Sequence, residues 1–221
     1  MTGTDSGVGK TTCTVALARA LVATGRRVAV MKPVAAGAER TPEGLRNDDA
    51  RALIAASNVS APYEIVNPCC LPLAASPHIA AAEAGVTIDV AQLARCATRL
   101  ATGADVLLIE GAGGWLAPIS ERETMADVAR ALGAPVLLVV GLRLGCLNHA
   151  LLTRAAIRAT GLGFAGWIAN HLDAEMIRVE ANIATLESRL DAPLLARIPH
   201  GASAEAAVAA LADAVQRPPF R

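Results

Sequence analysis

Gly3-Thr4-Asp5-Ser6-Gly7-Val8-Gly9-Lys10-Thr11 is the stretch that decides the fold class of this 221-residue chain. It is a glycine-rich turn that ends in Gly-Lys-Thr and leads directly into an apolar, helix-prone run. Glycines let successive backbone N–H groups converge on phosphate oxygens, and a helix N-terminus adds the positive end of a dipole. We therefore expect a phosphate-binding loop in which the Lys10 ammonium contacts the outer phosphates and the Thr11 hydroxyl binds magnesium.

The spacing within this loop departs from the common pattern. Five residues separate Gly3 from Gly9, whereas four ordinarily separate the first glycine from the Gly-Lys pair. The lysine, the threonine and the following helix still agree with a phosphate site. A glycine-rich turn that caps a helix by chance is therefore the weaker interpretation.

Short β-rich runs alternate with alanine-rich helical runs along the chain, which is typical of a parallel sheet wound with crossover helices. We expect one α/β domain, residues 1–221, with a P-loop NTPase fold: a mostly parallel sheet with helices on both faces. The expected strands are Arg27–Val34, Asp105–Glu110, Pro135–Gly141, Phe164–Asn170 and Leu194–Ile198. The expected helices are Lys10–Ala23, Asp48–Ser57, Val90–Ala101, Thr124–Leu132, Asn148–Thr160, Glu175–Leu190 and Ala204–Val215. Four prolines make Val59–Pro77 an irregular excursion, directed toward a substrate site.

The start of the chain is unusual for this fold. A P-loop ordinarily follows a buried strand, yet only Met1 and Thr2 precede the loop. The sequence therefore predicts that the first strand is truncated, by about six residues, the length of an ordinary strand. Two explanations stay open: a start recorded too far downstream, which we favour, or a vacancy tolerated in the middle of the sheet.

Composition narrows the functional classes. The 20 basic and 20 acidic residues balance, and no run of lysine or arginine could follow a nucleic-acid backbone, so nucleic acid is not an expected partner. No apolar run reaches the roughly 18 residues of a membrane helix, and the first residues do not resemble a secretion signal. We therefore expect a soluble, cytoplasmic protein without a membrane partner. The five cysteines lack metal-binding spacing and are interpreted as reduced packing residues.

Two expected strand ends carry further candidate chemistry. Glu110 follows an apolar run and precedes the glycine-rich residues 111–114, a position from which a carboxylate can hold magnesium. Lys32 closes another strand before Pro33, and Lys10 and Lys32 are the only two lysines beside 18 arginines. A compact ammonium fits beside a tetrahedral phosphate or a carbamate, where a planar guanidinium is too wide.

Two adjacent carboxylates begin the helix expected at residues 48–57. Asp48 and Asp49 are both candidates for a magnesium ligand, and both are candidates for a simple helix cap. Residue chemistry alone leaves that choice open.

Seven segments, taken in order, resemble the dethiobiotin synthetase family over essentially the whole chain. They are Thr2–Thr11, Lys32–Gly37, Thr41–Asp49, Ser76–His78, Glu110–Trp115, Leu144–His149 and Gly166–Asn170. The resemblance implies a ligase of biotin biosynthesis that closes the ureido ring of dethiobiotin from 7,8-diaminopelargonic acid and CO2, through a carbamate and a carbamic–phosphoric anhydride. It also implies Mg2+, ATP as co-substrate, and a homodimer with the substrate site at its interface.

The same resemblance assigns roles to residues. Lys32 and Lys10 would be catalytic, and magnesium would be held by Thr11, Asp49 and Glu110, which decides between the two aspartates. Nucleotide contacts would come from Gly7, Val8, Gly9, Lys10, Thr11, Thr12, Asp49, Glu110, Gly111, Ala112, Gly113, Asn170, His171, Pro199, His200 and Gly201. Substrate contacts would come from Ser6, Lys32 and Ala36, and from the other subunit's Leu144, Gly145, Cys146 and Asn148. Ala36 stands where the family often has serine, and His171 where relatives can carry an acid.

Other functional classes are weaker alternatives. A partition-type or metal-insertion ATPase would couple the same fold to a conformational switch, but such proteins usually carry a further lysine near the start of the loop. No lysine precedes Lys10. A cobyrinic acid amidating synthetase needs a glutaminase domain, for which 221 residues leave no room. A catalytically dead binding module is disfavoured because the full set of candidate residues is present, namely Lys10, Thr11, Lys32, Asp49 and Glu110.

Overall fold

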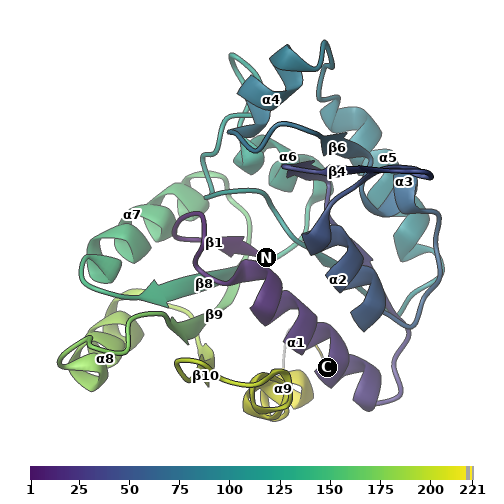
Figure 1. The fold of residues 1–221 in the computed structure, drawn as a ribbon. Helices are drawn as coiled ribbons and strands as arrows, with labels where there is room; N and C mark the ends of the chain where they lie inside the picture. Colours follow the sequence, from purple (N-terminus) through teal and green to yellow (C-terminus); the bar gives the residue numbers. More distant parts are fainter. Residues whose placement is uncertain (218–219, 221) are drawn as a thin grey trace.

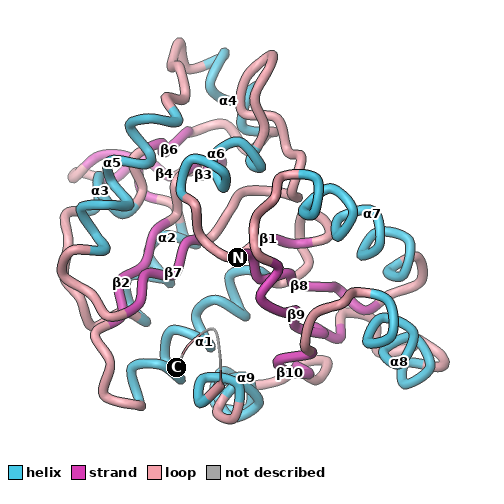
Figure 2. Tube along the Cα trace, turned by 180° about the vertical axis from the view of Figure 1, so that it is seen from behind, coloured by secondary structure: helices cyan, strands magenta, loops and turns pink. Residues whose placement is uncertain are grey.

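Parallel strands form the centre of the computed structural model, which describes residues 1–217 and residue 220, and they fall into two pieces (Figures 1 and 2). The larger piece has the order β1-β8-β9-β10. Its strands are β1 (Thr2–Gly3), β8 (Val136–Leu142), β9 (Phe164–His171) and β10 (Leu194–Ile198). The smaller piece pairs β2 (Val28–Met31) with β7 (Val106–Ile109). Every pair in both pieces is parallel, as the sequence predicted.

Helices cover both faces of these strands. On one side α1 packs between α2 and α9, while α7 lies against α8 and β8, and α5 lies against α6 and β2 (Figure 1). The bounds are α1 (Lys10–Ala23), α2 (Asp48–Ala56), α5 (Val90–Ala101), α6 (Met125–Leu132), α7 (Cys146–Ala159), α8 (Val179–Arg189) and α9 (Ala204–Leu211). The remaining elements are β3 (Val34–Ala36), β4 (Glu39–Thr41), β5 (Gly44–Arg46), α3 (Tyr63–Val66), β6 (Cys69–Leu71), α4 (Pro77–Glu83) and the 3-10 turn η1 (Ala214–Gln216). β3 pairs with β6 in parallel, and β4 with β5 as an antiparallel hairpin.

The apolar run of β8 shows how the core is built. Leu137 and Val139 belong to the hydrophobic cluster that contains α1 and α9, whereas Leu138 and Val140 belong to a second cluster with α7 and α8. Successive side chains of a strand point to opposite faces, so a strand covered on both faces must be apolar throughout. This explains why aliphatic residues, with few aromatics, can fill the core.

The strand before the P-loop is short but present. β1 has two residues, which pair with β8. Met1 joins the two sheet pieces, because its amino group donates to the Ile109 carbonyl at 2.6 Å and its carbonyl accepts from the Gly111 N–H at 3.0 Å. Figure 2 shows the N-terminus between the two pieces. Beside it lies an apolar cavity of about 140 Å³, lined by residues of β7, by Pro135 just before β8 and by Leu137 within β8. A gap between β7 and β8 therefore lies beside the two-residue strand β1.

All five predicted strands and seven predicted helices are found, and several boundaries change. The expected strand Arg27–Val34 breaks after Met31, because Pro33 has no N–H and the Lys32 N–H donates instead to the Val66 carbonyl at 2.9 Å. The excursion at residues 59–77 contains α3 and β6 and ends where α4 begins, and the β4–β5 hairpin was not predicted.

Three helix boundaries differ from the predicted ones by more than one residue. The helix expected from Glu175 begins at Val179 because Arg178 before it has a positive φ of 56°. The helix expected from Asn148 begins at Cys146, directly after Gly145 with φ 93°. The helix expected to reach Val215 ends at Leu211 and is followed by the 3-10 turn η1. Across residues 1–217 and 220, none of the helices combines the length and the apolar character needed to span a bilayer.

Candidate active site

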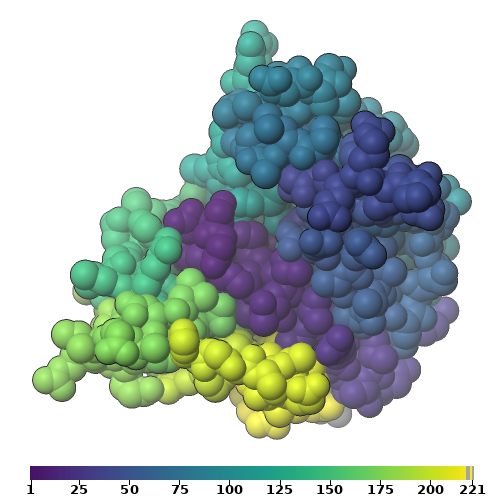
Figure 3. Space-filling model, in the orientation of Figure 1, coloured from purple at the N-terminus to yellow at the C-terminus, as the bar shows by residue number. Residues whose placement is uncertain are grey.

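The loop between β1 and α1 has the backbone of a phosphate cradle. Gly7 and Gly9 adopt positive φ angles of 68° and 84°, and Gly9 directly precedes the first residue of α1. A Cβ atom at Gly9 would collide with the Asn170 side chain. The Lys10 ammonium folds back over the loop and donates to the Asp5 carbonyl at 2.9 Å. In Figure 3 this purple N-terminal segment reaches the surface between the green and blue parts of the chain.

Asn170, at the carboxyl end of β9, supports this loop from within the protein. Its Nδ2 donates to the Val8 carbonyl at 2.9 Å, and the residue is buried. The resemblance assigned Asn170 to the nucleotide, and that contact stays a prediction, whereas the structure gives its side-chain amide a place in the loop scaffold. Sequence reasoning missed this role, for which the glycine at position 9 was the only local signal.

Four side chains from four elements meet beneath the loop. The Lys32 ammonium, which follows β2, donates to Glu110 Oε1 at 2.5 Å and to Asp49 Oδ2 at 2.8 Å. The Thr11 hydroxyl, on α1, donates to the same Glu110 oxygen at 2.8 Å. Asp49 lies in the first turn of α2, whose N-cap is Asn47. All three predicted magnesium ligands are therefore assembled around Lys32.

Burial and charge act in opposite directions on these groups. Burial alone lowers the pKa of Lys32, but the charges of Glu110 and Asp49 and their hydrogen bonds outweigh it, so its pKa is raised. The pKa of Asp49 is lowered, because Lys32 outweighs the opposing effect of burial. For Lys10, burial and the nearby Lys32 charge both lower the pKa. Lys32 is thus held firmly as a cation, while Lys10 lacks an anionic partner strong enough to offset its burial.

The buried carboxylate of Glu110 bears on whether a metal ion fits this site. Its side chain is fully buried, and its Oε2 atom has no hydrogen-bond partner among the described residues. A buried carboxylate oxygen left unsatisfied costs free energy, and a divalent cation would relieve that cost. Glu110, Asp49 and the Thr11 hydroxyl supply the hard oxygen ligands that Mg2+ prefers. The residues present therefore fit magnesium.

A cavity of about 680 Å³ opens over these groups. Of the residues with a predicted role, it brings together Ser6, Gly7, Gly9, Lys10, Thr11, Thr12, Lys32, Ala36, Asp49, Ala112 and Gly113. It is also lined by residues without a predicted role, namely Ala35, Asn47, Ala75, Ser76, Pro77, Gly114, Ala117 and Pro118. The signal for the segment at 75–77 was the irregular, proline-rich excursion, and the signal for Gly114 was the glycine run after Glu110.

Other residues with a predicted role do not line this cavity. Val8 and Glu110 are buried, and Gly111 faces a smaller cavity beside Met1. His171 ends β9, and its ring lies edge-on to that of His200 with centroids 6.2 Å apart, beyond the end of β10. Pro199 and Gly201 flank His200 in the same turn.

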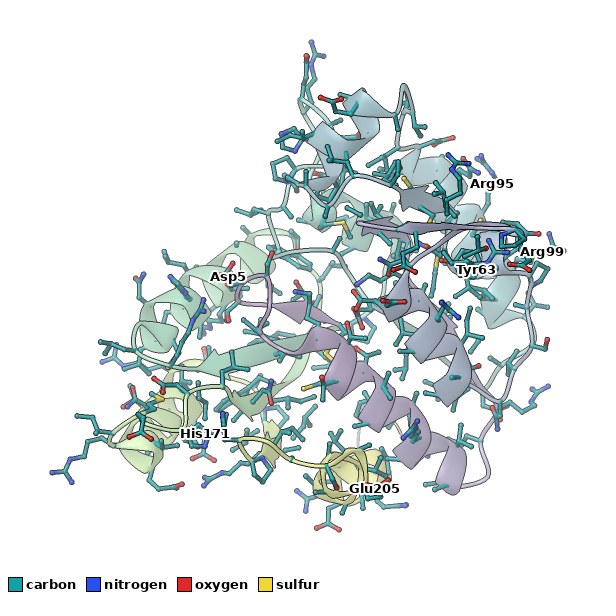
Figure 4. The ribbon with its side chains drawn as sticks, in the orientation of Figure 1. Asp5, Tyr63, Arg95, Arg99, His171 and Glu205 are labelled. Atoms are coloured by element: carbon teal, nitrogen blue, oxygen red, sulfur yellow. The ribbon has the colours of Figure 1, made fainter. Side chains whose placement is uncertain are left out.

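The predicted partner-subunit contacts lie at the start of α7. Leu144 is 96% exposed, whereas Cys146 is buried in the cluster shared with β8 and α8. Gly145 and Asn148 belong to the same segment and, like them, do not line the cavity. Arg143, just before it, donates to Asp5 Oδ2 at 2.8 Å and so ties this segment to the phosphate-binding loop. Figure 4 shows Asp5 on the side of the molecule next to α7.

Comparison with known proteins finds a matching family and relatives that align over nearly the whole chain. A family model described as an AAA domain matches residues 1–207. The ATP-dependent dethiobiotin synthetase BioD of Xanthomonas oryzae pv. oryzae (strain PXO99A) is 51% identical over 210 residues, which cover 95% of this chain and 94% of that protein. The protein of the same name from Pseudomonas paraeruginosa (strain DSM 24068 / PA7) is 50% identical over 215 residues, with coverages of 96% and 94%.

Solved structures with the same fold are more distant in sequence. The MinC:MinD cell division protein complex of Aquifex aeolicus contains a chain that matches with a TM-score of 0.62 at 17% identity, covering 98% of this chain and 93% of that one. The cell division ATPase MinD of Pyrococcus furiosus matches with a TM-score of 0.54 at 22% identity, with coverages of 100% and 90%. Identities this low establish a shared P-loop α/β fold and nothing about activity.

Proposed function

Because the chain belongs to the ATP-dependent dethiobiotin synthetase family, we propose that it closes the ureido ring of dethiobiotin from 7,8-diaminopelargonic acid and CO2 with ATP. One observation carries the proposal: the only two lysines, Lys10 and Lys32, line the same cavity, and both are buried. Phosphate binding alone accounts for Lys10. A second buried ammonium in the same cavity is not needed for phosphate binding alone, and it supports the presence of a second anion that reacts with the phosphate.

The phosphate end of the reaction uses the loop and α1. Backbone N–H groups of residues 7–12 would bind the triphosphate, and Lys10 would leave the Asp5 carbonyl to contact its outer oxygens. Thr11, Asp49 and Glu110 would hold Mg2+, which when bound neutralises charge on the terminal phosphates. Binding a polyanion also favours the charged form of Lys10, whose pKa burial lowers in the free protein.

The substrate end uses Lys32. One amine of the substrate attacks CO2 and forms the C–N bond of a carbamate with loss of a proton. A carbamate oxygen then attacks the γ-phosphorus, the bond to ADP breaks, and a carbamic–phosphoric anhydride results. The second amine attacks the carbamoyl carbon, phosphate leaves with the C–O bond electrons, and a second proton is released as the ring closes. The Lys32 ammonium, held in place before the substrate arrives, stabilises the carbamate and the departing phosphate.

The proposal also covers the adenine base of ATP and the partner subunit of a homodimer. We place the adenine against the segment of Asn170 and His171 and the turn at residues 199–201, since the pairing of β9 with β10 brings these two segments side by side. We also propose a homodimer in which residues 144–148 contact the partner's substrate carboxylate. Leu144, just before α7, is 96% exposed and Leu152, on α7, is 62% exposed, so this region offers apolar side chains to such an interface. A cytoplasmic location fits the five free thiols.

The test is to mix the purified protein with ATP, Mg2+, diaminopelargonate and 13C-bicarbonate, and to identify products by mass spectrometry. We expect dethiobiotin that carries the label at its ureido carbon, with one ADP formed for each ring closed. Omitting the diamine should abolish most ADP formation. ADP release that does not depend on the diamine would instead identify a switch ATPase.

The interface has a separate test. Lys10→Ala removes a group of the subunit's own cavity, and Asn148→Ala removes a group that would act on the partner's substrate. If the site is shared, mixing the two inactive variants restores part of the activity, because mixed dimers contain one intact site. No recovery in a mixture shown to exchange subunits would contradict the shared site.

A further inference from the structure

The backbone of Lys32 is fixed by a turn that takes no part in the chemistry. Its N–H donates to the Val66 carbonyl at 2.9 Å, and its carbonyl accepts from Asn67 Nδ2 at 2.7 Å. Asn67 ends the short helix α3 and is only 2% exposed. Both polar backbone groups of Lys32 are therefore bound to residues 66–67.

The hydroxyl of Tyr63, the only tyrosine of the chain, joins this turn to α2. It donates to Asn67 Oδ1 at 3.0 Å and accepts from the Asn47 N–H at 2.8 Å. Asn47 is the N-cap of α2, where its Oδ1 accepts from the Ala50 N–H at 3.3 Å. Two carbonyls bind the Asn67 amide nitrogen, so the Tyr63 hydroxyl faces its oxygen and must donate to it.

These contacts close a ring of interactions. From the Lys32 carbonyl it passes through Asn67, Tyr63 and Asn47 to the first turn of α2, where Asp49 lies. The Asp49 carboxylate then accepts from the Lys32 ammonium at 2.8 Å. The same side chains therefore determine where the backbone of Lys32 sits and where the carboxylate that holds its ammonium sits.

We propose that Tyr63 and Asn67 are positioning residues for the ligase reaction, which fix the Lys32 ammonium relative to Asp49. Neither residue lines the cavity, so both act through other groups. Figure 4 shows Tyr63 on the side of the molecule away from Asp5 and the phosphate-binding loop. The inference rests on the proposed function for what Lys32 does, but the geometry it concerns is independent of the substrate.

A phenol suits this position because it accepts one hydrogen bond and donates another. Burial raises the pKa of Tyr63 to about 12, so the hydroxyl remains a donor throughout the neutral range. The Arg46 guanidinium covers the ring at 4.2 Å from its centroid and holds it in place. Phenylalanine would keep the ring and its packing but leave the Asn47 N–H and Asn67 Oδ1 without a partner.

Tyr63→Phe is the test. We expect kcat for dethiobiotin formation to fall about 10- to 100-fold, as when a group that orients a metal ligand is removed, and the Mg2+ concentration for half-maximal rate to rise. Binding of ADP without Mg2+ uses the P-loop and should stay unchanged. The control is Cys70→Ala, because Cys70 Sγ lies 3.7 Å from the same hydroxyl but outside the ring of contacts. It should leave all three measurements unchanged.

Two outcomes would overturn the inference: an unchanged kcat in Tyr63→Phe, or a loss of rate no larger than the loss of folded protein seen in thermal unfolding. A second variant, Asn67→Ser, should cause a similar loss, and combining it with Tyr63→Phe should add little because both break one chain of contacts. Measuring how ATP binding depends on Mg2+ tests this inference separately from the proposed function. If the native protein makes no dethiobiotin, a weakened Mg2+ dependence in Tyr63→Phe still supports positioning, and an unchanged one refutes it.

Discussion

Replacing Lys32 by arginine separates the charge of this residue from its shape. Lys32 is 4% exposed and faces Glu110, which is fully buried, so removing the cation altogether by Lys32→Met would leave an uncompensated buried carboxylate. We expect Lys32→Met to destabilise the fold by about 3–5 kcal/mol. Lys32→Arg keeps a cation opposite Glu110 and Asp49, and its larger volume in a packed site costs about 1–3 kcal/mol. The arginine variant should therefore fold.

Although the fold should tolerate arginine at position 32, catalysis should not. A guanidinium pointed at the two carboxylates cannot also occupy the compact position of the ammonium beside the carbamate. Loss of one preorganised electrostatic contact lowers kcat by about 10²- to 10³-fold, or about 2.7–4 kcal/mol. Nucleotide affinity, which the loop and Lys10 provide, should change little. Dethiobiotin measured by mass spectrometry gives kcat, and calorimetric titration with ADP gives the affinity.

A matched control makes the result decisive. Arg27→Lys makes the reverse change, from a guanidinium to an ammonium, in an exposed ion pair with Asp105 at 3.0 Å. It should leave turnover unchanged. If Lys32→Arg turned over at the native rate with native affinity, the ammonium would have no special role. The mechanism would then lose Lys32.

Further predictions concern the metal, the pH dependence and the gap in the sheet. Glu110→Gln removes the charge of the buried carboxylate, so the Mg2+ concentration for half-maximal rate should rise by about tenfold or more, and an unchanged Mg2+ dependence would exclude Glu110 as a ligand. Burial places the pKa of Lys10 below its ordinary value, and only the ammonium form binds phosphate, so nucleotide affinity should fall as pH rises through that pKa. Lys10→Arg should remove this decline at alkaline pH. If the decline persisted in the variant, another group would be responsible for it. Adding five apolar residues before Met1 should fill the gap between β7 and β8 and raise Tm, by about 2–4 °C for each kcal/mol gained, whereas a Gly/Ser extension of equal length should give no such rise. Equal Tm values for the two extensions would show that the gap does not accept a strand.

The sequence predicted those parts of the molecule that depend on local patterns. The loop at residues 3–11, helix α1 and the buried strand β8 carry their information in consecutive residues. The candidate chemistry at Lys32 and Glu110 followed from a rule of topology, since the carboxyl ends of parallel strands meet at one edge of the sheet. Composition added the contrast between two lysines and 18 arginines.

The supporting contacts were not predictable, because they join residues distant in the chain. Asn170 reaches the Val8 carbonyl across 162 positions, and Asn67 reaches the Lys32 carbonyl across 35. Tyr63 begins a helix of four residues within a proline-rich segment, which is too short for a periodic pattern. Its part in the site depends on a hydroxyl whose two partners lie on opposite sides of it in the sequence.

The register between β2 and β7 explains why the Lys32–Glu110 ion pair forms where it does. β2 and β7 run in parallel register from Val28 opposite Val106 to Met31 opposite Ile109, so Lys32 and Glu110 are the next residues on both strands. The Glu110 N–H still donates to the Met31 carbonyl at 2.8 Å, which holds this register up to the site. A slip of one residue would turn the Glu110 side chain to the other face and separate it from Lys32. Because this register is set by the β2–β7 pair itself, the Lys32–Glu110 pair does not depend on how much of β1 fills the gap on the other side of β7.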